Sequence, residues 1–233
     1  MFLANEVTAG QLAGDVAPAV LCSVEHDDWH VVGFEYIDGR PANLAPGSAD
    51  LDRIGDTLDT LSGLPAGDTR PLQLRWANSN HWRNAAERAP ESVSGWDIER
   101  MCEWSARAPE LVNGNTLLHT DLHHDQFLIT DDRVYVIDWA FPGAGAPWVD
   151  AAFLSLRLTG SGYTHAEAYQ WARRRKGWAA TDTDTLAESV TAWAVYVAGL
   201  WSWFAVQDGV LAFAEYRANL VRSYAAWCLR ELV

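Results

Sequence analysis

The chain has 233 residues, of which 49% are hydrophobic and 21% charged, a balance typical of a globular protein with a sizeable core. Its 31 acidic and 17 basic residues give a net charge of −14, which argues against a nucleic-acid partner because an anionic surface repels phosphate backbones. The three cysteines have no metal-binding spacing and the first residues do not resemble a signal peptide. A cytoplasmic protein with reduced, buried thiols is therefore predicted.

The N-terminal part of the sequence predicts a small β-containing region. Residues 1–15 have loosely helical spacing of apolar residues. The apolar runs at 20–24 and 29–36 flank a polar turn, which predicts an antiparallel hairpin. The residues that follow, 37–42, include glycine and proline and predict a linker.

The rest of the sequence predicts a mainly helical chain with one short β region. Leucine and isoleucine at helical spacing predict a helix that begins at Ser48 and ends at Gly63. Another helix is predicted over 96–107, ended by Pro109, and a strand–loop–strand core over 116–138. After Pro147, four helices are predicted, at 149–159, 164–176, 182–207 and 209–232.

One of these helices tests whether the protein could enter a membrane. No charged residue occurs between Ser189 and Gln207, and this stretch approaches the length of a membrane span. However, Glu188 and Asp208 bound it, and no cationic flank sets an orientation. A buried core helix, with no membrane partner, is the prediction.

Two aspartates indicate the chemistry. Asp121 lies in a polar loop after an apolar strand, and Asp138 ends a strand 17 residues later, so both are expected on the same side of the hairpin. This layout suits phosphoryl transfer, in which one carboxylate orients the attacking hydroxyl and another binds magnesium. Gln126 could offer its amide oxygen to the same metal. His119 could brace the loop backbone.

These residues resemble the aminoglycoside phosphotransferase family, the small-molecule branch of the protein-kinase-like fold. The family pattern is His-x-Asp-x-His-x-x-Asn, a short hairpin, and then Ile-Asp-Trp or Ile-Asp-Phe. His119, Asp121, His123 and Asp138 match it. The resemblance implies that Asp121 is the catalytic aspartate and Asp138 a metal ligand, with His119 and His123 in supporting roles.

Two more segments extend the resemblance. The run Trp148-Val149-Asp150-Ala151-Ala152 is similar to the start of the family's next helix, which implies that Asp150 caps the helix and supports the catalytic loop. Residues 29–39 are similar to the last strand of the N-lobe and the hinge. The resemblance implies that the backbone of Glu35, Tyr36 and Ile37 binds the adenine of ATP, or the base of GTP.

The fold that follows is α+β: a protein-kinase-like bilobed fold with a truncated β-containing N-lobe and a mainly helical C-lobe. Residues 1–36 are predicted to form a partial N-lobe, with a helix like the kinase C helix and a β-hairpin. Residues 37–42 would be the hinge. Residues 43–233 would form the helical C-lobe, with the catalytic loop and the metal-binding hairpin.

The sequence departs from the family in two respects. Gln126 stands where the family has asparagine, and no Gly-x-Gly-x-x-Gly loop or N-lobe lysine is found, since the single lysine is Lys176. Glu6 is interpreted as the glutamate that normally pairs with that lysine. Either the native protein begins earlier, or it lacks these elements and should bind and turn over nucleotide poorly.

The leading functional hypothesis is a phosphotransferase that uses ATP or GTP with Mg²⁺ and acts on a hydroxyl of a small molecule. The acidic composition mildly favours a cationic substrate. One alternative is a catalytically impaired kinase-like protein with a binding or regulatory role. A remote alternative is a metal-dependent hydrolase whose ligands would be His119, Asp121, His123, His124 and Asp125.

Overall fold

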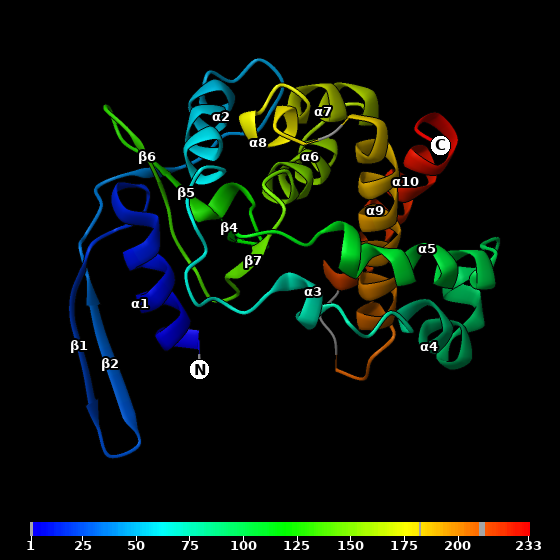
Figure 1. Ribbon diagram of the computed structural model, residues 1–233, viewed down its shortest axis with the longest axis horizontal. Helices are drawn as coiled ribbons and strands as arrows, with labels where there is room; N and C mark the ends of the chain where they lie inside the picture. Colours follow the sequence, from blue (N-terminus) through cyan, green and yellow to red (C-terminus); the bar gives the residue numbers. More distant parts are fainter. Residues whose placement is uncertain (1, 182, 210–212) are drawn as a thin grey trace. The chain divides into compact units, whose positions relative to one another are not determined.

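The computed structural model describes residues 2–181, 183–209 and 213–233, which form helices and short sheets (Figure 1). The chain divides into two compact units, each built from two stretches of sequence. The first unit contains Met1–Pro71 and Gly114–Ala180, and the second contains Leu72–Asn113 and Thr181–Val233. The predicted α+β class is confirmed, whereas the lobe boundary at 37–42 stays a prediction.

The first unit begins with a helix and a hairpin. α1 (Phe2–Ala13) leads through a 3-10 turn, η1 (Gly14–Val16), to β1 (Val20–His26) and β2 (Trp29–Phe34). The two strands pair antiparallel, with Val24 opposite Val31, and α1 contacts both of them (Figure 1). The two apolar runs around a polar turn therefore predicted this hairpin correctly.

Two further small sheets surround the polar loop. β3 (Arg40–Pro41) lies within the predicted linker and pairs with β5 (Phe127–Ile129), which pairs in turn with β6 (Val134–Val136). β4 (Thr116–Leu118) does not join them but pairs antiparallel with β7 (Gly143–Gly145). The strand–loop–strand core expected over 116–138 is therefore present, whereas β7 and its pairing with β4 were not predicted, because a Gly-Ala-Gly strand has no side-chain pattern by which a sequence predicts it.

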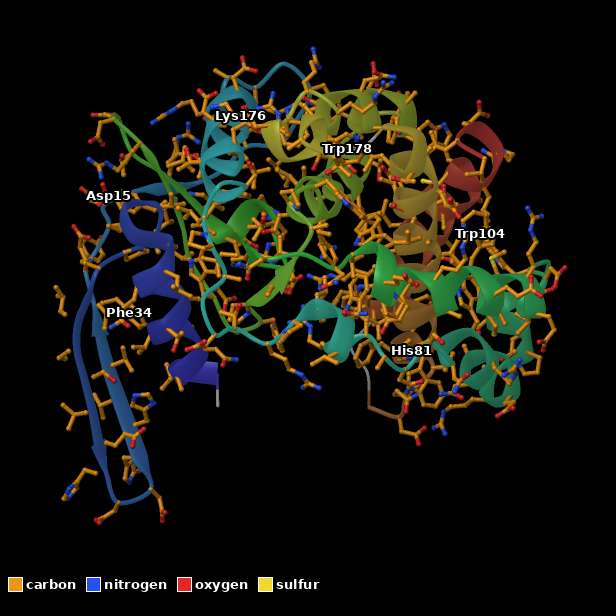
Figure 2. The ribbon with its side chains drawn as sticks, viewed as in Figure 1. Asp15, Phe34, His81, Trp104, Lys176 and Trp178 are labelled. Atoms are coloured by element: carbon orange, nitrogen blue, oxygen red, sulfur yellow. The ribbon has the colours of Figure 1, made fainter. Side chains whose placement is uncertain are left out.

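The helices of the first unit are α2 (Asp50–Leu61), α6 (Val149–Gly160), α7 (His165–Ala172) and α8 (Lys176–Ala179). The prediction of one helix over 164–176 is wrong, since α7 ends before α8 begins. The Asp59 carboxylate accepts a hydrogen bond from Lys176 N at 2.7 Å and lies 3.5 Å from Arg175 Nη1, which secures the break against α2. Trp178 lies on α8, close to Lys176 at the start of that helix (Figure 2). Its ring packs edge-on against Trp148 and Tyr169.

The second unit is helical in the residues described. It contains α3 (Leu72–Arg75), α4 (His81–Arg88), the 3-10 turn η2 (Pro90–Val93), α5 (Ile98–Leu111), α9 (Thr183–Ala205) and α10 (Phe213–Glu231). α9 contacts α4, α5 and α10. The buried Trp82 of α4 donates its indole N–H to the carbonyl of Val195 at 2.8 Å.

The structure tests the expectations about the helix end near Pro109, a membrane-spanning helix and the burial of the cysteines. α5 continues to Leu111 instead of ending before Pro109, because Val112 N donates to Ala108 O and completes the last turn. No helix within the described residues is long and apolar enough to cross a membrane. Of the three cysteines, only Cys228 is buried, while Cys22 is exposed, so the expectation of buried thiols is wrong for the latter.

Candidate active site

The loop after β4 is held by one carboxylate. Asp150, 5% exposed at the start of α6, accepts hydrogen bonds from His119 N at 2.7 Å and from Thr120 N at 2.9 Å. Thr120 also donates its hydroxyl to Phe141 O at 2.7 Å. Its φ of +67° is left-handed, an unusual conformation for a β-branched residue. The contacts made by Asp150 therefore fix the backbone immediately before Asp121.

The His119 ring connects the loop that carries Asp121 to the segment that ends at Asp138. Its Nδ1 accepts from Asp121 N at 3.3 Å, and its Nε2 lies 3.0 Å from Ile137 O. Because a carbonyl can only accept, the ring is the neutral tautomer with hydrogen on Nε2. The residue is 1% exposed and packs on Trp139, with 4.8 Å between ring centroids. His119 thus ties Asp121 to the residue before Asp138.

The Asp121 carboxylate has a partner that the sequence did not reveal. Arg157 Nη2 lies 3.2 Å from Asp121 Oδ1, and the arginine side chain is only 11% exposed, compared with 36% for the aspartate. Arg157 follows Asp150 by seven residues on α6, which is two helical turns and therefore the same helix face. That spacing is the sequence signal that could have identified it.

The two predicted metal ligands lie together. Gln126 Nε2 donates to Asp138 Oδ2 at 3.2 Å, and Ile137 N donates to Gln126 O at 2.9 Å. Gln126 is 5% exposed, and its Oε1 is buried without a hydrogen-bond partner. Asp138 has a left-handed φ of +63°. A carboxylate beside an unsatisfied amide oxygen is a donor set that fits a hard cation such as Mg²⁺.

A cavity of about 390 Å³ adjoins Asp138. Glu35, Tyr36 and Ile37, the predicted base-binding residues, line it together with Glu6 and Asp138. Glu35 N donates to Ala19 O at 2.8 Å, so this amide is already used. The remaining lining is mostly apolar, with side chains such as Phe34, Leu128 and Trp139.

Glu6 reaches this cavity from α1. Its neighbour Asn5 donates its side-chain amide to Ala140 O at 2.9 Å, two residues after Asp138. Burial, and then the negative charge of Asp138, raise the pKa of the Glu6 carboxyl above its ordinary value. The two carboxylates are therefore close enough for their charges to interact.

The residues of the hydrolase alternative do not converge as a metal centre. His123, His124 and Asp125 have potential ligand atoms within 4.8 Å of one another, and His123 Nδ1 accepts from Asp125 N at 3.3 Å. However, both ring nitrogens of His119 already bond to the backbone, and Asp121 faces Arg157. The hydrolase set of five ligands is therefore not supported.

Comparison with solved structures shows which fold the chain has. A choline/ethanolamine kinase family protein from Mesorhizobium loti has a similar structure, with a TM-score of 0.62 and 17% identity, covering 97% of this chain and 84% of that chain. The choline kinase LicA from Streptococcus pneumoniae has a TM-score of 0.62 and 15% identity, covering 96% and 80%. A spectinomycin phosphotransferase solved with ADP and spectinomycin has a TM-score of 0.61 and 11% identity, covering 97% and 83%. The predicted protein-kinase-like fold is thereby confirmed.

No curated protein sequence matches the chain. The family model described as the phosphotransferase enzyme family, APH, matches residues 8–188. Because this range is more than half of the 233 residues, the chain belongs to the phosphotransferase enzyme family, to which the pattern around Asp121 and Asp138 pointed.

Proposed function

We propose that this protein transfers the terminal phosphoryl group of ATP or GTP to a hydroxyl of a small molecule. The observation that carries the proposal is the chain of hydrogen bonds through His119, which joins Asp121 to the backbone beside Asp138. Asp138 also lines a cavity large enough for part of a nucleotide, together with the predicted base-binding residues. Acceptor activation at Asp121 and nucleotide binding beside Asp138 would then be linked through the two hydrogen bonds of the His119 ring.

Asp121 would be the acceptor-activating group. Its partly exposed carboxylate can accept the hydrogen bond of a substrate hydroxyl, orient the oxygen for in-line attack and receive its proton. Arg157 would hold the carboxylate in this orientation. Asp150 would keep the loop backbone in place, and His119 would brace it without transferring a proton, since its ring is occupied.

Asp138 and Gln126 would hold Mg²⁺. When bound, Mg²⁺ neutralises charge on the phosphate oxygens of the nucleotide. Gln126 stands in place of the family's asparagine and turns its amide nitrogen toward Asp138, so a half turn of the amide would be needed to offer Oε1 to the cation. His123 would shape the loop by capping η3 (His124–Gln126), which carries Gln126.

The substrate class is proposed on chemical grounds. The similar structures include choline kinases and a spectinomycin phosphotransferase. The net charge of −14 favours an acceptor with a cationic group. The proposal includes a location in the cytoplasm, where the nucleotide is available, and excludes a nucleic-acid substrate.

Nucleotide binding and turnover test the proposal separately. ATP and GTP affinities are measured by calorimetry with and without Mg²⁺, for the wild type and Asp138→Ala. We expect binding that depends on Mg²⁺ and is lost in the variant. Asp121→Asn should abolish phosphorylation of a panel containing choline, ethanolamine and spectinomycin, while nucleotide binding is kept.

Two results would count against the proposal. No detectable binding of either nucleotide at millimolar concentration would favour the kinase-like binding or regulatory protein, since transfer needs a bound donor. Full turnover by Asp121→Asn would show that another group activates the acceptor.

A further inference from the structure

We propose that His123, His124 and Asp125 bind a divalent transition-metal ion, with zinc as the representative. None of the residues proposed to activate the acceptor or to hold Mg²⁺ is among these ligands. The inference therefore goes beyond the proposed function and does not depend on it. It involves three of the five residues of the hydrolase set and assigns no hydrolysis to them.

The cluster is a feature of this chain and not of the family pattern. In the pattern His-x-Asp-x-His-x-x-Asn, the two positions after the second histidine are variable, and this sequence has His124 and Asp125 there. Neither residue takes part in the proposed phosphotransfer. The two positions therefore add a second imidazole and a carboxylate to a pattern that requires neither.

A tight backbone turn brings the three side chains together. The backbone of His123 is extended, with φ of −149° and ψ of 179°, and the 3-10 turn η3 begins at the next residue. Gln126 N donates to His123 O at 3.0 Å and closes the turn. Among the residues that the structure describes, this is the one group of three or more histidine, cysteine or acidic residues whose ligand atoms all lie within 4.8 Å of one another.

The distances within the cluster suit a tetrahedral ion. His123 Nδ1 lies 3.6 Å from Asp125 Oδ2, and His124 Nε2 lies 3.3 Å from Asp125 Oδ1. Bonds from zinc to nitrogen or oxygen are about 2.0–2.1 Å long, so a tetrahedral zinc ion keeps its ligand atoms roughly 3.3 Å apart. Both separations between an imidazole and the carboxylate are therefore already close to the required value.

The His123 ring is in the protonation state that a metal ligand needs. Its Nδ1 accepts a hydrogen bond from Asp125 N at 3.3 Å, so this nitrogen carries no hydrogen and presents its lone pair toward Asp125. A hydrogen bond of this length is weak, and a metal ion can replace it.

The exposure of the three side chains leaves the position accessible. The His123 side chain is 18% exposed, whereas those of His124 and Asp125 are 59% and 60% exposed. The more buried ring is a fixed ligand, and the two exposed side chains leave an entry path and a fourth coordination position for water.

The donor set also defines the class of metal. Two imidazole nitrogens and one carboxylate suit Zn²⁺ and ions of similar preference, such as Co²⁺, whereas Mg²⁺ prefers oxygen ligands. The proposed Mg²⁺ site at Asp138 and Gln126 offers oxygen atoms alone. The choice of ion therefore separates the two positions.

Calorimetric titration of the metal-free full chain with Zn²⁺, without nucleotide, tests the inference. We expect one Zn²⁺ per chain at the tightest site, with affinity reduced at least about tenfold in His124→Gln and in Asp125→Asn. An excess of Mg²⁺ should not displace the zinc.

The matched control is His26→Gln. His26 Nε2 lies 3.7 Å from Asp27 Oδ2, and both side chains are exposed, so the pair resembles part of the cluster. In the described part of the chain it belongs to no group of three ligands. This variant should bind Zn²⁺ as the wild type does.

X-ray absorption of the zinc-loaded protein identifies the ligand atoms. We expect nitrogen and oxygen at about 2.0–2.1 Å and no sulfur at about 2.3 Å. The exposed Cys22 is the competing ligand. A sulfur neighbour would assign the zinc to a cysteine and overturn the proposed site.

The remaining outcomes separate this inference from the proposed function. Zinc affinity unchanged in both His124→Gln and Asp125→Asn, or reduced equally in His26→Gln, would overturn the site, since binding would then be that of any exposed histidine. Displacement by Mg²⁺ would place the ion with Asp138 and overturn it as well. Zinc binding as expected, in a protein that binds no nucleotide, would support the site and count against the proposed function alone.

Discussion

At the scale of single residues, the site depends on two strained backbone positions. Thr120 and Asp138 have left-handed φ values of +67° and +63°, which cost energy for residues other than glycine. Both conformations are maintained by neighbouring contacts, from Asp150 and Phe141 around Thr120 and from Gln126 at Asp138. The spacing of His119, Asp121 and Asp138 predicted which residues gather here. The backbone conformation depends on contacts 12–30 residues distant in sequence, so no local pattern shows it.

The anchoring role of Asp150 leads to a first prediction. Asp150→Ala removes both acceptors of the His119 and Thr120 amides, so the loop should shift and turnover should fall about 100-fold, the effect expected of a displacement near 1 Å. The melting temperature should fall as well, because two buried N–H groups lose their partner. Steady-state kinetics and thermal unfolding measure the two effects.

The control for this variant is Asp68→Asn, an exposed loop carboxylate of the same unit. It should change neither quantity. An Asp150→Ala protein with wild-type turnover would show that the loop is held by its remaining contacts.

Arg157 gives a second prediction at this scale. Arg157→Met removes the guanidinium 3.2 Å from Asp121 Oδ1, so the carboxylate should lose its fixed orientation. We expect kcat to fall by about 10- to 100-fold, no more than the smallest contribution typical of a positioned proton acceptor, with nucleotide affinity unchanged. Arg157→Lys should restore part of the loss, since lysine keeps the charge but not the planar geometry.

Arg133→Met is the matched control, because the Arg133 ion pair with Asp132 is exposed. Equal losses in kcat for both arginine variants would indicate a general effect of charge. A change in KM for nucleotide alone would place Arg157 in donor binding instead.

At the scale of elements, regular side-chain patterns were predictable and backbone-driven features were not. The β1–β2 hairpin follows from two apolar runs around a polar turn, and α2 from buried leucines at helical spacing. β7 was missed because its residues are glycine and alanine. The break between α7 and α8 was missed because it depends on Asp59, more than 100 residues earlier.

Two helical glycines give a prediction at this scale, with opposite signs for the same change. A Cβ at Gly199 of α9 would overlap the indole of Trp82, which is fully buried and bonded to Val195 O. Gly199→Ala should therefore destabilise the protein by about 1–3 kcal/mol. A Cβ at Gly10 of α1 would meet Val20 Cγ2 at 3.7 Å, an ordinary contact.

Gly10→Ala should therefore stabilise the protein by roughly 0.5–1 kcal/mol through helix propensity. Urea unfolding of both variants measures the difference. If Gly199→Ala is as stable as the wild type, the packing of Trp82 against α9 must be looser than the structure shows.

At the scale of the whole molecule, the chain enters each unit more than once. The division falls at Pro71, Asn113 and Ala180, so each unit combines segments far apart in sequence. The two units are defined by contacts between residues far apart in sequence, and local sequence patterns do not predict such contacts. α1 and the loop that carries Asp121 belong to the same unit.

Stability in acid is a property of the whole molecule that the carboxylates predict. Hydrogen bonds lower the pKa of three carboxyl groups. Arg40 donates to Asp50, and the backbone and hydroxyl of Thr164 donate to Glu167. The Thr130 hydroxyl donates to Asp132. A carboxyl with a lowered pKa binds more protons in the unfolded state, so its stabilising contribution is complete above the ordinary pKa and is lost as the pH falls through the folded value. The pKa of Glu6 is raised, so protonation of this one group favours the folded state as the pH falls. The three carboxyls with lowered pKa values outweigh it.

The melting temperature should therefore decline as the pH falls below about 4.5 and continue to decline below the ordinary Asp value of 3.8. Asp50 should account for a large part of this loss, because it is 4% exposed and accepts from Arg40 Nη1 and Nη2 at 2.6 and 2.7 Å. Asp50→Asn should lower the melting temperature at pH 7 and flatten its dependence on pH in the acid range. Asp52→Asn, an exposed position on the same helix, should follow the wild-type curve. An Asp50→Asn curve parallel to that of the wild type would assign acid unfolding to other carboxylates.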